Sequence, residues 1–299
     1  MSRKSISPEE KNAVVGGTLY LVSTPIGNLS DLSERAVKIL GEVDFIAAED
    51  TRNTGKLLAC IGVSRPMVSY HEHNKREAGE RILARLTAGE SCALVSDAGT
   101  PAVSDPGEDL VALCAASGVP VTSVPGCCAA ITALALSGLS TARFIFEGFL
   151  PVERARRRER LSLLEAQTAT MIVYEAPHKL RGTLADLVAA LGSERRVALC
   201  RELTKRNEEI FRTTLGDAVI YYDEAEPRGE YVLVIEGAKN APVRGDIAER
   251  TALSPAEHVA YFEREGLSRM DAIKAAAKER GVPKNQLYKM LCDEKGEKS

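Results

Sequence analysis

The sequence of 299 residues contains no tryptophan, and aromatic residues make up only 5% of it. Proteins that hold long single strands of nucleic acid usually stack bases on aromatic side chains, so this class is disfavoured. No run of 18 apolar residues is present, which argues against a membrane-spanning helix. The polar first residues lack the apolar segment of a secretory signal, and we expect a cytoplasmic protein.

Metal ligands are also scarce. The seven cysteines include no CxxC pair, and there are four histidines in the whole chain. His71 and His73, in the segment YHEHN, are more typical of a solvated loop than of a metal pair, although they could touch a substrate. We therefore expect no metal, and unpaired cysteines of this kind are typical of a reducing compartment.

The balance of charge does not by itself point to nucleic acid. The formal net charge is −3, whereas a nucleic-acid enzyme often carries a basic surplus. The distribution is uneven, however, and two basic segments stand out near the middle and the end of the chain. Hydrophobic residues make up 44% and charged residues 27%, which is ordinary for a globular protein.

The first α/β domain is expected to span residues 17–125, after a disordered arm over residues 1–16. Short apolar segments alternate there with amphipathic ones, which predicts an open parallel sheet with crossover helices. The predicted strands are 18–23, 43–48, 66–70, 92–96 and 121–124, and the predicted helices lie near 31–41, 52–61, 74–88 and 106–117. Asp31, three residues before Glu34, is expected to cap the first helix, and the helices are expected to end near left-handed Gly41, Gly62, Gly89 and Gly118.

A second α/β domain is expected over residues 126–238, with less regular spacing and therefore a mixed sheet. Its predicted strands are 143–148, 170–174, 196–200, 209–214 and 230–237, and its predicted helices lie near 153–166, 177–191 and 215–222. A linker over residues 239–253, a small helical domain resembling a helix-turn-helix over 254–292 and a polar tail over 293–299 complete the predicted organisation. The fold class is therefore α/β, with two α/β domains and a helical C-terminal domain.

Unusual loops follow several strands of the first predicted sheet. They are Ser23–Asn28, Glu49–Arg52, Ser96–Gly107 and the Pro125–Gly126 pair. Such loops could simply be turns, and Asp105 could simply cap the next helix. The twelve-residue segment SDAGTPAVSDPG is long for a plain connection, however, and ligands bind at the carboxyl ends of parallel strands. A carboxylate there could hold ribose hydroxyls or an ammonium group.

These loops also carry a family resemblance. SDAGTPAVSDPG, together with STPIGN and AEDTR, closely resembles the bacterial ribosomal RNA small subunit methyltransferase I family, whose members are tetrapyrrole-methylase-like (class III) methyltransferases. The resemblance continues through VPGCCAAITALALSGL, FEGFLP, YEAPHKL, RELTK and GEYVLVIEG, and covers nearly all of residues 17–291.

The resemblance implies an activity and a cofactor site. The family transfers a methyl group from S-adenosylmethionine to the 2′-hydroxyl of a cytidine in the decoding region of 16S rRNA, within the 30S subunit. The resemblance also implies a homodimer. The cofactor is expected in a cleft between the two α/β domains. At the position of Cys127, proline is the commoner residue in the family. The cofactor-binding residues implied for this sequence are Thr24, Pro25, Asp97, Ala98, Gly99, Val103, Ser104, Cys127, Cys128, Tyr174, Ala176, Leu203 and Gly229.

Activation of the acceptor hydroxyl needs a base or a hydrogen-bond acceptor, because a ribose hydroxyl is a poor acid. Glu49 and Asp50 are the candidates, since the second strand should deliver them to the mouth of the cleft, and Arg52 could bind the adjacent phosphate. Glu202 and Lys205 are weaker candidates. Helix capping and ion pairing remain an alternative role for Glu49 and Asp50.

Two basic segments are candidate RNA contacts. Five arginines fall within residues 154–160, and residues 268–291 carry a net charge of +4. The predicted RNA-binding residues are Arg154, Arg156, Arg157, Arg158, Lys284 and Lys289. The arginine run could instead be a solvated helix face, and the C-terminal helices a cap on the core.

Two other functions remain open from the sequence alone. A methyltransferase of the same fold could act on a small tetrapyrrole, although it would not need the basic segments. A non-catalytic helix-turn-helix regulator is the other alternative, but it leaves AEDTR and the long loop unexplained. A nicotinamide-dependent oxidoreductase is disfavoured because no GxGxxG follows the first strand.

Overall fold

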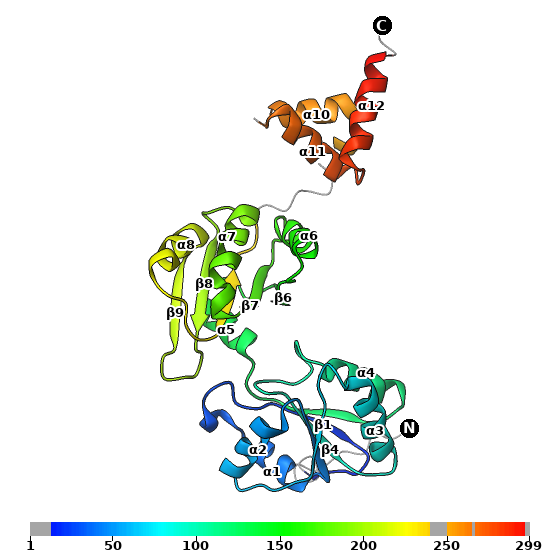
Figure 1. Cartoon of the computed structure of the whole chain (residues 1–299), viewed down its shortest axis with the longest axis vertical. Coiled ribbons are helices and arrows are strands. Elements are labelled where there is room, and N and C mark those ends of the chain that lie inside the picture. Colours follow the sequence, from blue (N-terminus) through cyan, green and yellow to red (C-terminus); the bar gives the residue numbers. More distant parts are fainter. Residues whose placement is uncertain (1–12, 240–249, 265–266, 297–299) are drawn as a thin grey trace. The chain divides into compact units, whose positions relative to one another are not determined.

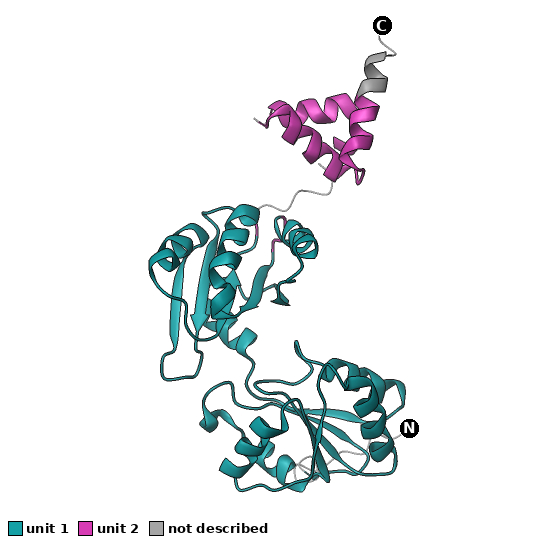
Figure 2. Cartoon of the chain, in the orientation of Figure 1, with its two compact units in different colours: residues 1–165, 169–237 teal, residues 166–168, 238–299 magenta. Residues whose placement is uncertain are grey.

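A computed structural model describes residues 13–239, 250–264 and 267–296. The chain divides into two compact units, one containing both α/β lobes up to residue 237 and the other the C-terminal helices with residues 166–168 (Figure 2). The expected arm, linker and tail fall largely or partly outside the described residues. Within the arm, the amide of Val15 donates to the Tyr20 hydroxyl at 2.8 Å.

The first lobe, drawn mainly in blue and cyan in Figure 1, is built on a parallel sheet. Five strands form this sheet, in the order β3-β2-β4-β1-β5. Its strands are β1 (Leu19–Val22), β2 (Phe45–Ala48), β3 (Met67–Ser69), β4 (Cys92–Val95) and β5 (Val121–Val124). Its helices are α1 (Glu34–Glu42), α2 (Thr51–Cys60), α3 (Lys75–Thr87) and α4 (Gly107–Ala116). The parallel sheet predicted from the alternating pattern is therefore confirmed.

Both faces of this sheet are buried, which explains why its strands are almost entirely apolar. On one face, Val22 and Ile46 pack in a core with Ile39 of α1 and Leu58 of α2. On the other face, Phe45 packs in a core with residues of α3 and α4. The helices on the two faces leave the carboxyl ends of the strands free for loops.

Two local predictions about helix ends are wrong. The N-cap of α1 is Ser33, whose hydroxyl accepts the amide of Ala36 at 3.1 Å, whereas Asp31 ends a short 3₁₀ turn at Leu29–Asp31. Ser33 is the better cap because it stands directly before the first helical residue. Gly41 lies inside α1 without a left-handed backbone. The other three glycines do adopt positive φ, at Gly62, Gly89 and Gly118.

The second lobe contains a mixed sheet with the order β6-β7-β10-β8-β9, as predicted. Its strands are β6 (Phe144–Phe149), β7 (Thr170–Glu175), β8 (Arg196–Arg201), β9 (Glu209–Thr214) and β10 (Tyr231–Ile235). Only β6 and β7 are parallel, and β10 lies between β7 and β8, antiparallel to both. The helices are α5 (Ala129–Ser137), which packs on one face, and α6 (Arg154–Leu164), α7 (Leu180–Leu191) and α8 (Leu215–Glu224), which cover the other.

The second unit contains α10 (Pro255–Arg264), α11 (Arg269–Glu279) and α12 (Lys284–Gly296). Gly281 turns the chain between α11 and α12 with φ of 66°, and Leu287 and Leu291 of α12 pack against the alanines of α11. None of the helices in the described ranges is both long enough and apolar enough to cross a membrane.

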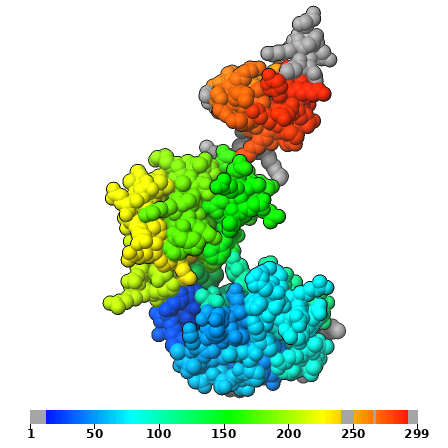
Figure 3. Space-filling view, viewed as in Figure 1, coloured from blue at the N-terminus to red at the C-terminus, as the bar shows by residue number. Residues whose placement is uncertain are grey.

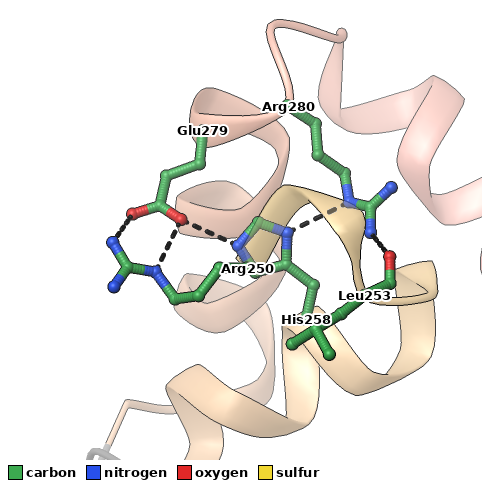
Figure 4. A network of polar contacts seen from close by, with 5 residues as sticks. All are labelled: Arg250, Leu253, His258, Glu279 and Arg280. Atoms are coloured by element: carbon green, nitrogen blue, oxygen red, sulfur yellow. Dashed lines mark hydrogen bonds and ion pairs between the residues drawn. The ribbon is translucent and has the colours of Figure 1, made fainter. Parts of the chain in front are cut away.

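A buried polar network joins the helices of this unit (Figure 4). His258 is fully buried; its Nε2 lies 2.8 Å from Glu279, and its Nδ1 accepts from Arg280 at 3.0 Å. Since Nδ1 accepts, the ring proton belongs on Nε2, where it is donated to Glu279. Burial would raise the pKa of Glu279, but hydrogen bonds from Arg250 and His258 hold it below its ordinary value.

Candidate active site

A cavity of about 600 Å³ lies within the first unit and is lined by both α/β lobes. Figure 3 shows the surface hollowed between the first lobe, in blue and cyan, and the second lobe, in green. The first lobe contributes the ends of β2 and β4 and the long loop after β4, and the second contributes the ends of β7, β8 and β10. Its volume is in the range of small-molecule and cofactor sites.

The loop Asp97–Thr100 is held in place by the Ser23–Asn28 segment. Backbone hydrogen bonds join Thr24 and Gly99 in both directions, at 2.9 and 3.1 Å. The Thr24 hydroxyl donates to the carbonyl of Ser96 at 3.3 Å, and Thr24 is only 2% exposed. Thr24 therefore supports the loop from below, while the exposed carboxylate of Asp97 lines the cavity.

The second half of the long loop is organised by Asp105. Its carboxylate accepts the amides of Ala102 at 2.9 Å, Val103 at 3.3 Å and Gly107 at 2.8 Å. Asp105 therefore does serve the start of α4, the capping role left open by the sequence, and it also shapes the cavity wall. Ala102 and Ser104 have φ of 66° and 67°, and such strained residues are typical of ligand sites.

The second lobe supplies a largely apolar wall. The Tyr174 hydroxyl accepts the amide of Ala130 at 3.1 Å, and its ring contacts Phe146 and Phe149 edge-on, with centroids 5.0 and 5.7 Å away. Burial raises the pKa of Tyr174 to about 12, so the phenol stays protonated at neutral pH. Leu203 adds a buried aliphatic surface beside it.

Nine of the thirteen residues predicted to bind the cofactor line this cavity: Asp97, Ala98, Gly99, Val103, Ser104, Cys128, Tyr174, Ala176 and Leu203. The other four, Thr24, Pro25, Cys127 and Gly229, lie outside the lining. Cys127 acts through its backbone, since its carbonyl accepts the Thr100 hydroxyl at 2.9 Å. At Gly229, φ is 75° and an added Cβ would lie 2.6 Å or less from the Glu202 carboxyl group.

Several lining residues are absent from the sequence-based prediction. The second lobe contributes Glu175, Pro177, His178, Cys200, Glu230, Tyr231 and Val232, and the first lobe contributes Ile26, Thr100 and Asp105. Many belong to segments that carried the resemblance, such as YEAPHKL and GEYVLVIEG, but had no individual signal there.

The three candidate catalytic residues have different surroundings. Glu49 lines the cavity, and burial, together with the nearby Asp97 and Asp105 charges, raises its pKa, although a hydrogen bond from the Asp97 backbone opposes the rise. Asp50 caps α2 by accepting the amide of Arg52 at 2.8 Å and pairs with that guanidinium at 2.7 Å. These bonds hold the pKa of Asp50 far below its usual range, which makes it a poor base.

The remaining polar candidates sit around this centre. The Arg52 side chain is 85% exposed and lies outside the cavity lining. Lys205 lines the cavity and is held by Glu202 at 2.8 Å and Glu230 at 2.9 Å. The rings of His71 and His73 lie 6.0 Å apart, beyond the cavity lining.

The predicted RNA-binding arginines of α6 divide into two groups. Arg154 and Arg158 are exposed and have no ion pair among the described residues, and exposed Arg156 pairs with Glu153 at 3.1 Å. Arg157, by contrast, is only 17% exposed and its guanidinium is bonded inside the lobe. On α12, Lys284 is half-buried and Lys289 is exposed.

Comparison with known proteins identifies the family. The model for tetrapyrrole (corrin/porphyrin) methylases matches residues 18–219. A protein from Synechocystis sp., named ribosomal RNA small subunit methyltransferase I, is 46% identical over 92% of this chain and 97% of its own length. A Bacillus subtilis protein of the same name is 43% identical over 96% of this chain and 98% of its own. The chain belongs to the ribosomal RNA small subunit methyltransferase I family. The resemblance found in the sequence is thus confirmed.

Solved structures agree with this family in fold. Uroporphyrin-III C-methyltransferase from Thermus thermophilus, crystallised with S-adenyl homocysteine, superposes with a TM-score of 0.53 at 20% identity, covering 73% of this chain and 97% of that one. Cobalt precorrin-4 methyltransferase gives 0.53 at 17% identity, covering 77% and 98%. The chain therefore has the tetrapyrrole methylase fold that its sequence predicts.

Proposed function

We propose that this protein transfers a methyl group from S-adenosylmethionine to the 2′-hydroxyl of a cytidine in the decoding region of 16S rRNA, within the 30S subunit. Relatives at 41–47% identity are named small subunit rRNA methyltransferases, which supports the class of reaction and substrate. The observation that carries the proposal is the cavity, where a cofactor-sized space meets a half-buried carboxylate, Glu49.

The cavity residues fit an adenosyl sulfonium compound. Leu203 and Val232 offer apolar surface to a flat base, and the exposed Asp97 carboxylate can accept from ribose hydroxyls or an ammonium group. Thr24, Cys127 and Gly229 would support the loops rather than touch the ligand. When bound, the cofactor supplies an activated methyl group, so the protein needs mainly to align the acceptor oxygen with it.

Glu49 is the residue we assign to the acceptor hydroxyl. With the cofactor bound, the Glu49 carboxylate would accept the proton that the acceptor hydroxyl loses on methylation, and would then release it to water. A raised pKa brings a carboxylate closer to the pH of the reaction and makes it a better base. Asp50 holds Arg52, whose exposed guanidinium would bind the phosphate beside the target ribose.

Basic side chains outside the cavity would hold the folded rRNA. Arg154, Arg156 and Arg158 lie exposed on α6, and Lys284 and Lys289 lie on α12. Phosphate contacts of this kind give affinity that falls with salt and little sequence preference. The choice of nucleotide would then come from the shape of the RNA around the cavity. A homodimer remains a prediction.

The test is a mass-spectrometric map of ribose methylation in 16S rRNA from cells with and without this protein. We expect one cytidine 2′-O-methyl group to disappear on deletion and to return with the wild-type gene but not with Glu49→Gln. Unchanged ribose methylation would reject the substrate. Transfer of a labelled methyl group to porphyrinoids but not to 30S particles would favour the tetrapyrrole alternative.

A further inference from the structure

The basic helix α6 has an inner face as well as an outer one. Arg157 and Arg160 share one face of it with the buried Leu161 and Leu164, since the four positions follow the i, i+3, i+4, i+7 spacing. Arg160 donates to Glu147 of β6 at 2.5 Å. These two arginines therefore bond to the lobe, while their neighbours in the run face solvent.

The bonds of Arg157 lead to the cofactor cavity. Its Nε donates to Asp186 at 2.6 Å, and one of its terminal nitrogens donates to the Thr183 hydroxyl at 2.8 Å. That hydroxyl donates its own hydrogen to Glu175 Oε2 at 2.5 Å. Glu175 Oε1 accepts the amide of Ala176 at 2.9 Å. The chain of hydrogen bonds thus runs from α6 through α7 to the end of β7.

Each hydrogen bond between Arg157, Thr183 and Glu175 has a fixed direction. A guanidinium only donates and a carboxylate only accepts, so the Thr183 hydroxyl must accept from Arg157 and donate to Glu175. Thr183 is 1% exposed and Glu175 is 5% exposed. Burying a carboxylate without hydrogen-bond donors is energetically unfavourable, so these bonds determine the orientation of the Glu175 side chain.

Glu175 and Ala176 are both part of the cavity wall. We infer that Arg157 is a positioning residue for cofactor binding, which acts through Thr183 and Glu175 to fix the backbone at Ala176. It is not an RNA contact, because its guanidinium is occupied and only 17% exposed. This replaces the role that the sequence suggested for Arg157.

The inference rests on S-adenosylmethionine as the cofactor but not on the rRNA nucleotide. Binding of S-adenosylhomocysteine to the full-length protein, measured by calorimetry, therefore tests it independently of the methylated site. The variants are Arg157→Ala and Thr183→Val, with Thr183→Ser as the rescue variant that keeps the hydroxyl. Arg154→Ala, on the outer face of the same helix, is the matched control for loss of an arginine.

We expect Arg157→Ala and Thr183→Val each to weaken cofactor binding about tenfold, which corresponds to about 1.4 kcal/mol. Thr183→Ser should bind the cofactor analogue within about twofold of wild type. The double variant Arg157→Ala/Thr183→Val should bind no more weakly than the weaker-binding of the two single variants, because both substitutions interrupt the same series of hydrogen bonds. Affinity for 30S particles should fall in Arg154→Ala and stay unchanged in Thr183→Val.

A cofactor affinity equal to wild type in folded Thr183→Val would overturn the inference, and so would a loss of 30S affinity in Arg157→Ala as large as that in Arg154→Ala. Thermal unfolding identifies any variant that does not fold. If Arg157→Ala fails to fold, the Thr183→Val and Thr183→Ser pair decides the question, since the two differ chiefly in a hydroxyl group. Loss of binding in both Thr183 variants would also contradict it.

Discussion

The two α/β lobes contribute to the same cavity in different ways. The first lobe provides carboxylates and polar loops, among them Glu49, Asp97 and Asp105, whereas the second provides a wall built around Tyr174 and Leu203. The difference follows from the sheets. In the parallel sheet all carboxyl ends meet at one edge, so every loop there can carry chemistry. In the mixed sheet only some strands end at the cavity. We propose that the first lobe supplies the catalytic carboxylate and part of the cofactor site, and that the second lobe supplies the rest of the cofactor site.

The largest expected effect is that of Glu49→Gln in the first lobe. The amide cannot take a proton, so the rate of methyl transfer to 30S particles should fall by about 100-fold or more. Cofactor affinity should change little, because the amide keeps the shape of the carboxyl group. Single-turnover kinetics with calorimetry on the same sample measures both. A rate near that of wild type would show that Glu49 is not the base and that the first lobe does not supply one through this carboxylate.

The pH dependence of Glu49 gives a second readout. Its pKa is raised in the folded protein, so the wild-type rate should increase with pH through a value above that of an ordinary glutamate, and Glu49→Gln should lose this rise. Because the pKa of Glu49 is higher in the folded than in the unfolded protein, protonation of Glu49 stabilises the folded state. This stabilisation is fully present below the unfolded-state pKa and is lost as pH rises through the folded-state pKa. Glu49→Gln should therefore be more stable than wild type at pH 7 by thermal unfolding.

Asp97→Ala should weaken S-adenosylhomocysteine binding by about 10- to 100-fold, the range for a lost hydrogen bond to a charged group. Glu108→Ala is the matched control, because Glu108 is an exposed carboxylate of the same lobe outside the cavity lining. Calorimetry at constant salt compares the two. Equal affinities for the two variants would show that the first lobe does not contact the cofactor through this carboxylate.

In the second lobe, Gly229→Ala should destabilise the protein by about 1–3 kcal/mol and weaken cofactor binding, since φ of 75° is strained for alanine and its Cβ would meet Glu202. Gly182→Ala is the control: it lies in α7 with nothing within 4 Å of an added Cβ. There alanine should stabilise by about 0.5–1 kcal/mol. Urea unfolding would contradict this account if both variants changed stability in the same direction.

The smallest effect is expected in the second unit, at two lysines of α12. Replacing Lys284 and Lys289 by alanine should lower 30S affinity a few-fold and reduce the salt slope by about one for each phosphate that the variant no longer binds. Lys38→Ala, in α1, serves as the control. Filter binding at several salt concentrations measures the slope, and a slope equal to that of wild type would exclude α12 from RNA binding.

The same comparison explains what the sequence could predict. The loops after β2 and β4 are recognisable because they follow buried parallel strands, and Asp97 and Glu49 stand directly in them. Glu230, Tyr231 and Val232 could not be found this way. They lie at the amino end of β10, which reaches the cavity only because it is antiparallel, with Tyr231 paired to both Glu175 and Arg201. A strand's direction within a mixed sheet is not visible in its own residues.

The sequence also could not show which arginines of the run at residues 154–160 are exposed and which are bonded inside the lobe. Arg154 and Arg157 look equivalent in the sequence, yet one is exposed and the other is bonded to Asp186 and Thr183. The partners of Arg157 lie in α7, 26 and 29 residues further along the chain. His258 in α10 is likewise bonded to Glu279 at the end of α11 and to Arg280, which follows it.

The most direct test of the account is a crystal structure of the protein with S-adenosylhomocysteine. We expect the ligand in the cavity, with Asp97 on one side, Ala176 and Leu203 on the other, and its sulfur facing Glu49. Density for the ligand at another site, or a cavity that stays empty at saturating ligand, would contradict the assignment of this cavity, lined by both lobes, to the cofactor.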